Sequence, residues 1–97
     1  MVLEIAQITA QSGKTEELRA GLVAALSVIR GAEGCLSAVA RQQIEDPSVF
    51  VLTIEWETLE HHTVKFRGGP LFAEYRSHIN GLFVDPIVAR HYQTVAE

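Results

Sequence analysis

The sequence predicts an α+β domain in which helices cover one face of a four-stranded antiparallel sheet. Three observations lead to this fold class. The helix and strand signals follow in the order strand, helix, strand, strand, interrupted helix, strand. The segment Val49 to Glu57 alternates with the period of two that is typical of a strand, and both of its sides are largely apolar. A chain of 97 residues forms one domain, 1–97, which buries roughly 65% of the surface that the unfolded chain exposes.

The strand at 49–57 also predicts how the domain associates. Its two sides consist of Phe50, Leu52, Ile54 and Trp56, and of Val49, Val51, Thr53 and Glu55. Antiparallel sheets usually leave one face to water. Because the helices cover only one face of the sheet, we expect a second copy of the chain to cover the other, which gives a homodimer.

The N-terminal third predicts one strand and one helix. Residues Val2 to Ala10 are mainly apolar and β-branched, and Gln11-Ser12-Gly13 is a turn signal. Between Lys14 and Arg30 apolar residues recur at intervals of three and four, which indicates an amphipathic helix. Gly31 lies just beyond this segment as a stop signal.

The middle of the chain predicts a hairpin. The segment Cys35 to Ile44 alternates as a strand does, and Glu45-Asp46-Pro47-Ser48 is a turn sequence. Proline pre-sets the turn dihedral, and aspartate bonds its own backbone. The strands at 35–44 and 49–57 should therefore pair antiparallel.

Two short helices are predicted after the hairpin. Thr58 can cap a helix from about Leu59 to Arg67, and Gly68-Gly69 ends it. Pro70 suits the first turn of a further helix, since a proline there loses no helical hydrogen bond. The apolar side of that helix extends to Ile79.

The last predicted strand runs from Ile87 to Thr94, after Asp85-Pro86. The complete order of elements is that of a ferredoxin-like domain. Neither a repeat nor a linker interrupts it.

Composition and charge narrow the possible partners. The formal net charge is −4, and the eight Lys and Arg residues are scattered singly, so no stripe of positive charge predicts nucleic-acid binding. No stretch approaches the roughly 20 apolar residues of a membrane span, and we expect a cytoplasmic protein. The one cysteine, Cys35, cannot form an intrachain disulfide.

Several segments together resemble the antibiotic biosynthesis monooxygenase family over roughly Val2 to Val95. They are Gly34-Cys35-Leu36, Glu45-Asp46-Pro47, Phe50-Val51-Leu52, Trp56-Glu57 and His62. The resemblance implies ferredoxin-like subunits that pair into a dimeric α+β barrel, each with a cavity between the sheet and the helices that follow the tryptophan. Members include cofactor-independent monooxygenases of aromatic polyketides or quinols, haem-degrading enzymes and proteins of unassigned activity.

The chain departs from many members of this family on the strand at 49–57. Many have an acidic residue two positions before the tryptophan, whereas this chain has Ile54 there and Glu55 at the next position. Strand alternation points Glu55 away from the face that Trp56 shares with Ile54.

His62 is the predicted catalytic base. On a helix it shares a face with Phe66, four residues on, whereas His61 shares the other side with Lys65. A neutral imidazole can take a proton from a phenol. The structural alternative is a histidine that only fills the edge of the cavity.

Further predicted site residues are mostly aromatic. We expect Tyr75 to act with His62 in catalysis, and five residues to contact the substrate: Trp56, Phe66, Phe72, His78 and His91. Each has a structural alternative, because tryptophan at a strand end is often core, and an amphipathic helix packs its tyrosine on the sheet. The spacing offers neither His-x-x-x-His nor Glu-x-x-His on a helix, so we expect no metal site and no cofactor.

The predicted function is cofactor-independent monooxygenation of a small apolar, aromatic, quinol-type or polyketide substrate. Two alternatives remain: a non-catalytic dimeric module that binds a ligand, and a member that binds or degrades haem.

Overall fold

Four strands form one antiparallel sheet in the order β2-β3-β1-β4. Their bounds are β1 Val2–Ala10, β2 Cys35–Gln42, β3 Val49–Trp56 and β4 Phe83–Tyr92. The computed structural model describes all residues from 1 to 97. This strand order confirms the predicted ferredoxin-like fold, and β3, the strand predicted at 49–57, lies in the interior of the sheet.

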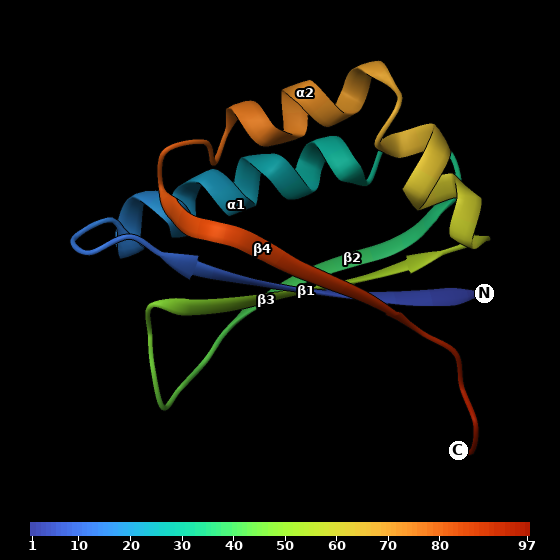
Figure 1. Cartoon of the computed structure of the whole chain (residues 1–97), viewed down its shortest axis with the longest axis horizontal. Coiled ribbons are helices and arrows are strands. Elements are labelled where there is room, and N and C mark those ends of the chain that lie inside the picture. Colours follow the sequence, from blue (N-terminus) through green and yellow to red (C-terminus); the bar gives the residue numbers. More distant parts are fainter.

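Both α-helices lie on the same face of the sheet, above it in Figure 1. They are α1, Thr15–Ile29, and α2, Pro70–Ser77. A short π-helix, η1, His61–Phe66, covers the end of the sheet at which β3 terminates. The opposite face of the sheet carries no helix. No helix of the chain has the length and apolarity that a membrane crossing requires.

The core forms where alternate residues of the central strands meet the helices. On β1 these are Ala6, Ile8 and Ala10, and on β3 they are Phe50, Leu52, Ile54 and Trp56. On α1 the buried stripe consists of Leu18, Leu22, Ala25, Leu26 and Ile29. The period of two on the strands and of three to four on the helix therefore produces one continuous apolar layer.

The two α-helices approach closely at one glycine. A Cβ atom added to Gly21 on α1 would lie 2.3 Å from the backbone oxygen of His78 at the end of α2. No larger residue fits there, so Gly21 sets the height at which α2 lies over the sheet.

Two predicted elements differ from the structure. The strand predicted at Ile87–Thr94 is β4, which begins at Phe83 and so includes Pro86. A proline has no N–H to pair, but β4 is an edge strand, where one side needs no pairing. The helix predicted at about Leu59 to Arg67 is present, but as a π-helix, because the N–H of Arg67 donates to the carbonyl of His62 five residues earlier.

The predicted capping and turn contacts are present. The Oγ1 atom of Thr58 accepts the N–H of His61 at 3.3 Å, which satisfies one of the free donors at the start of η1. The Oδ1 atom of Asp46 accepts both the N–H and the hydroxyl of Ser48, at 3.1 and 2.7 Å, and closes the hairpin turn.

Candidate functional site

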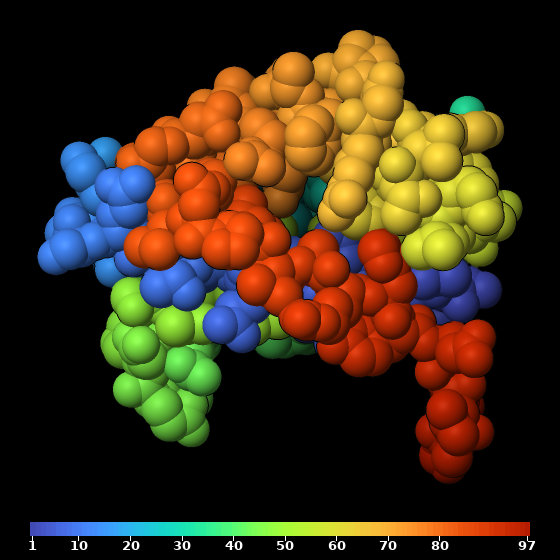
Figure 2. Space-filling view, viewed as in Figure 1, coloured from blue at the N-terminus to red at the C-terminus, as the bar shows by residue number.

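A cavity of about 270 Å³ lies between the sheet and the helices. In Figure 2 it is the hollow between α2 (orange) and β4 (red), with the end of α1 (teal) visible at its bottom. Apolar side chains from three elements form its floor and sides: Ala6, Ile29, Ile87 and Ala89. The polar and aromatic groups described next project into this apolar space.

Glu4 is one of only two buried polar side chains in the chain. Strand alternation places it on the same face of β1 as Ala6 and Ile8, and it is 4% exposed. Its Oε1 atom accepts the indole N–H of Trp56 at 2.9 Å. Burial raises the pKa of Glu4, while the hydrogen bond from Trp56 and the charge of Arg67 oppose that rise.

His62 is the other buried polar side chain, at 3% exposed. Its ring stacks on the indole of Trp56 with a centroid separation of 5.3 Å and an interplanar angle of 16°. Its Nε2 atom lies 3.4 Å from Oε1 of Glu4, and its Nδ1 atom lies 2.7 Å from Nε2 of His91. Burial, followed by the charges of Arg67 and His91, lowers the pKa of His62 to about 4, so the ring is neutral at pH 7.

Because His62 is neutral, its approach to Glu4 at 3.4 Å is a polar contact rather than an ion pair. The raised pKa of Glu4 and the lowered pKa of His62 have the same first cause, which is removal from water. A carboxyl group and an imidazole that have both lost solvation, and that meet at a cavity wall, are a typical arrangement for proton transfer.

The π-helix determines the direction of His62. Both buried residues of η1, His62 and Phe66, point toward the sheet. On the other side, His61 and Lys65 pair with Glu33; Lys65 is exposed as expected, whereas His61 is partly buried. Both rings of the buried side line the same cavity.

Aromatic rings form the wall of the cavity under the helices. Phe66 lies 5.6 Å from each of Trp56, Phe72 and Tyr75 by ring centroids. The phenol of Tyr75 belongs to a residue that is 6% exposed, and no other residue of the chain forms a hydrogen bond with it. Burial raises the pKa of Tyr75 to about 12, so Tyr75 is a hydrogen-bond donor at neutral pH.

Two arginines reach the cavity, and they differ in their contacts. Arg76 lies over the rings of Phe72 and Phe83, at 5.8 and 5.0 Å from their centroids. Arg67 forms neither a hydrogen bond nor an ion pair through its side chain, although its charge lowers the pKa of Glu4, His62 and His91. Arg67 is therefore a cation at the cavity that is free to hold an anionic group.

The structure brings most of the predicted site residues together. His62, Phe66, Phe72 and Tyr75 all line the cavity. Trp56 is fully buried behind His62 and contacts the site through Glu4 instead of lining the cavity.

The two further predicted histidines lie outside the cavity. His78 is exposed, because α2 ends at Ser77 and the chain turns away there. His91 points toward His62 from the far side and lines a separate surface hollow with Leu59 and Tyr92.

Glu4 is the residue of the candidate site that the sequence patterns miss. The available signal was a charged residue in phase with Ala6, Ile8 and Ala10 on the apolar side of the first strand. Glu4 is also the cross-strand partner of Ile54. Ile54 stands at the position where many members of the family that the sequence resembles have an acidic residue. The carboxyl group is thus present at the same level of the sheet, but on the neighbouring strand.

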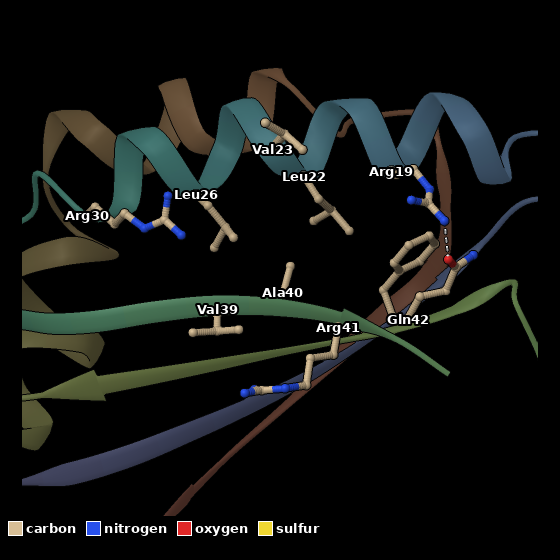
Figure 3. A pocket seen from close by; sticks show the side chains of 10 residues that line it. Arg19, Leu22, Val23, Leu26, Arg30, Val39, Ala40, Arg41 and Gln42 are labelled. Atoms are coloured by element: carbon tan, nitrogen blue, oxygen red, sulfur yellow. Dashed lines mark hydrogen bonds between the residues drawn. The ribbon is translucent and has the colours of Figure 1, made fainter. Parts of the chain in front are cut away.

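A larger hollow of about 330 Å³ lies between α1 and the edge strand β2 (Figure 3). Its polar groups are already paired. Arg19 donates to Gln42, as the dashed line in Figure 3 shows, and Arg30 donates to the backbone oxygen of Ala38 at 2.9 Å. Arg41 donates to Thr53 at 3.0 Å. We refer to this hollow as the α1 groove.

The chain contains no group of three or more His, Cys, Asp and Glu side chains that could hold a metal ion. In the cavity, both ring nitrogens of His62 already face protein atoms, namely Oε1 of Glu4 and Nε2 of His91.

The fold and the cavity define a ferredoxin-like α+β protein with an aromatic site between its sheet and helices. The sequence model of the antibiotic biosynthesis monooxygenase family matches residues 1–77, and the chain belongs to this family. The resemblance carried by the segments from Gly34 to His62 is thereby confirmed.

Solved structures support the same assignment. The chain is 33% identical to a Bordetella bronchiseptica protein that is provisionally named an antibiotic biosynthesis monooxygenase. The two structures agree with a TM-score of 0.91 over 98% of this chain and 97% of that chain. A Deinococcus radiodurans protein at 20% identity shares the fold, with a TM-score of 0.81 over 100% of this chain and 95% of its own.

A relative is also known from sequence. The uncharacterised protein YczJ of Bacillus subtilis is 28% identical over 95 residues, which cover 98% of this chain and all of YczJ. The similarity therefore extends over nearly all of this chain and over all of YczJ.

Proposed function

We propose that this protein is a cofactor-independent monooxygenase of small phenolic or enolic aromatic compounds. The observation that carries the proposal is that Glu4 and His62, the only buried polar side chains, meet each other at the wall of an aromatic cavity. A purely structural cavity has no reason to retain a desolvated carboxyl group, since burial without a purpose costs stability.

The size and lining of the cavity favour a compact, flat substrate. Its volume of about 270 Å³ is near the lower end of the range for ligand pockets, which favours one or two fused rings. The rings of Phe66 and Phe72 offer stacking surfaces. The hydroxyl of Tyr75 and the guanidinium of Arg67 can hold the oxygen of the substrate as it becomes negative.

The first chemical step is removal of a proton from the substrate. His62 was the predicted base, but with a pKa of about 4 it is a weak base by itself. The raised pKa of Glu4 makes its carboxylate the better acceptor, and His62 can stabilise that carboxylate through Nε2. We therefore assign the role of base to the pair.

The subsequent steps need only dioxygen. The substrate anion transfers one electron to O₂, and the resulting carbon radical and superoxide join to form a C–O bond. The peroxide O–O bond then breaks as the neighbouring C–H proton is removed, which leaves a carbonyl and releases water. One oxygen atom of O₂ enters the product, the other leaves as water, and the substrate CH₂ group is oxidised by four electrons.

The arrangement fits haem less well than a small aromatic compound. A haem iron would need a free imidazole nitrogen, whereas Nδ1 of His62 contacts His91 and Nε2 faces Glu4. The ring of His62 is also held flat against Trp56.

The proposal is tested by oxygen uptake with purified, metal-free protein against a panel of hydroquinones and polycyclic phenols. We expect uptake that depends on the substrate and is lost in His62→Ala. The matched control is His78→Ala, which removes an exposed imidazole outside the cavity. Unchanged turnover in His62→Ala would refute the assignment, and absence of uptake across the panel would favour a binding module instead.

We also propose that two copies pair through the uncovered face of the sheet. The apolar side chains on this face include Val39 and Val88, each 38% exposed, and Tyr92, 47% exposed. Light scattering after size exclusion tests this: we expect twice the mass of 10.7 kDa in wild type and a monomer in Val88→Lys.

A further inference from the structure

We propose that Glu4, His62 and His91 form a proton relay that links the cavity to the surface, with His91 as a positioning residue that acts through His62. This inference rests on the proposed function, since it gives the carboxyl group of the site a route to solvent that does not pass through the cavity. The register of β1 on β4 places Glu4 opposite His91, and η1 brings His62 into contact with both side chains.

The geometry consists of two links. Nε2 of His62 lies 3.4 Å from Oε1 of Glu4, and Nδ1 of His62 lies 2.7 Å from Nε2 of His91. Both nitrogens of the central ring are therefore used, one toward the cavity and one away from it. The ring cannot rotate freely, because it stacks on Trp56.

The two ends of the relay face different spaces. Glu4 and His62 line the cavity, whereas His91 lines the surface hollow with Val2, Leu59, Tyr92 and Gln93. His91 is only partly buried, so water in this hollow can reach its ring. The relay thus crosses the layer formed by η1 and the end of the sheet.

Two nitrogens at 2.7 Å require one hydrogen between them, so the tautomers of His62 and His91 are coupled. When Glu4 is a carboxylate, the proton of His62 is on Nε2, the nitrogen nearer to Glu4, and His91 donates from its own Nε2 to Nδ1 of His62. When Glu4 is a carboxylic acid, it donates to Nε2 of His62, His62 donates from Nδ1, and His91 has its proton on Nδ1.

Conversion between these two forms moves one proton. A proton from water binds Nδ1 of His91, the Nε2 proton of His91 moves to Nδ1 of His62, and the Nε2 proton of His62 moves to Oε1 of Glu4. Each imidazole is neutral before and after the transfer. Because the pKa of each ring is lowered, both rings are neutral at pH 7, and the transfer leaves no charge on either imidazole.

Other ionisable groups surround the relay and act on it electrostatically. They are Arg67 beyond η1, Tyr75 and Arg76 on α2, and Cys35 on β2. None of them links Glu4 to the surface hollow, so none replaces His91 as the outer end.

The test uses ¹⁵N and ¹³C NMR of the histidine rings and of the Glu4 carboxyl group, and needs no substrate. In wild type we expect Nε2-protonated His62 at high pH and a change to the Nδ1 tautomer at the same midpoint at which Glu4 binds its proton. In His91→Phe, which keeps an aromatic ring, we expect this tautomer change of His62 to be lost.

Tyr92→Phe is the matched control, since it alters the same surface hollow without touching His62. His91→Gln, a smaller and polar replacement, serves as the second variant if His91→Phe unfolds. A His62 ring that keeps one tautomer while Glu4 titrates in wild type, or that still changes tautomer in His91→Phe, would overturn the relay. Because the readout is a tautomer, its failure is distinct from a failure to find oxygenase activity.

Discussion

The cavity beneath α2 and the α1 groove are two hollows of similar size with opposite chemistry. The α1 groove is the larger, at about 330 Å³ against about 270 Å³. Its arginines already donate to Gln42, to the Ala38 backbone and to Thr53. In the cavity, by contrast, the side chain of Arg67 and the hydroxyl of Tyr75 have no partner in the chain.

The comparison shows that volume does not identify a site. In the α1 groove the polar groups stabilise the fold, because each one satisfies another group of the same chain. In the cavity a carboxyl group, an imidazole, a phenol and a guanidinium approach one apolar space from β1, from η1 with the turn after it, and from α2. Of these groups, the phenol of Tyr75 and the guanidinium of Arg67 remain available for a ligand, as a binding or reaction site requires.

The largest expected effect comes from Glu4→Gln, which removes the proton acceptor but keeps an oxygen for the indole of Trp56. We expect kcat for oxygen uptake to fall by about 10²-fold or more, as is usual for the loss of a general base. The free energy of unfolding should not decrease, because a neutral amide is cheaper to bury than a carboxylate. A wild-type kcat in Glu4→Gln would show that the carboxyl group of Glu4 does not distinguish the cavity from the α1 groove.

Arg67→Ala should have the next largest effect, on KM. An arginine that holds an anionic oxygen contributes about 1.5–3 kcal/mol, so we expect KM for phenolic substrates to rise about 10-fold or more. The corresponding methyl ethers, which cannot become anions, should bind equally well to both proteins. Equal effects on phenols and ethers would show that Arg67 is only part of the surface.

The acid stability of the protein should depend on the two buried groups in opposite directions. His62 has a pKa of about 4 when folded and 6.5 when unfolded, so the unfolded chain takes up a proton first as pH falls. This contribution is present above pH 6.5 and lost toward pH 4, and amounts to up to about 3 kcal/mol. The pKa of Glu4 is raised above 4.5, so its contribution grows as pH falls through that raised pKa.

Urea unfolding at about pH 7 and about pH 4.5 tests these signs. Relative to wild type, His62→Gln should lose less stability on acidification, and Glu4→Gln should lose more. Carboxylates with a lowered pKa, such as Asp46, act equally in all three proteins and cancel in the comparison. The same acid response in both variants would mean that the two groups are not desolvated together.

The smallest effect is expected in the α1 groove. Arg19 is exposed and pairs weakly with Glu16 at 3.7 Å, so Arg19→Ala should change the free energy of unfolding by no more than about 0.5 kcal/mol. Oxygen uptake should be unchanged for every substrate. A rise in KM similar to that of Arg67→Ala would show that both hollows take part in binding.

Patterning alone predicted the sheet and α1 closely. The first strand is Val2–Ala10 in both the prediction and the structure, and the third differs by one residue. These elements follow from the local periodicity of apolar residues, which can be seen directly in the sequence. The start of β4 could not be predicted in this way, because Pro86 lies on an edge strand and only the strand order reveals an edge.

The sequence patterns predicted those residues of the candidate site that lie on η1 and α2. His62 and Phe66 are four residues apart, and their shared face follows from spacing. Glu4 and His91 could not be connected in the same way, because they are 87 residues apart in the chain and meet as cross-strand partners of β1 and β4. His78 and Tyr75 separate because α2 stops at Ser77, a boundary that no local pattern marked.

The π-helix η1 has a genetic consequence. A π-turn corresponds to an α-helix with about one inserted residue, and removal of one residue between His62 and Phe66 would restore the α-helical hydrogen bonds. Each residue of an α-helix turns the chain by about 100°, so the two rings, then three residues apart, would stay on one side of the helix but be offset by about 60° from each other. A change of three nucleotides at this point can therefore turn one ring relative to the other, while the sheet, α1 and α2 keep their sequence.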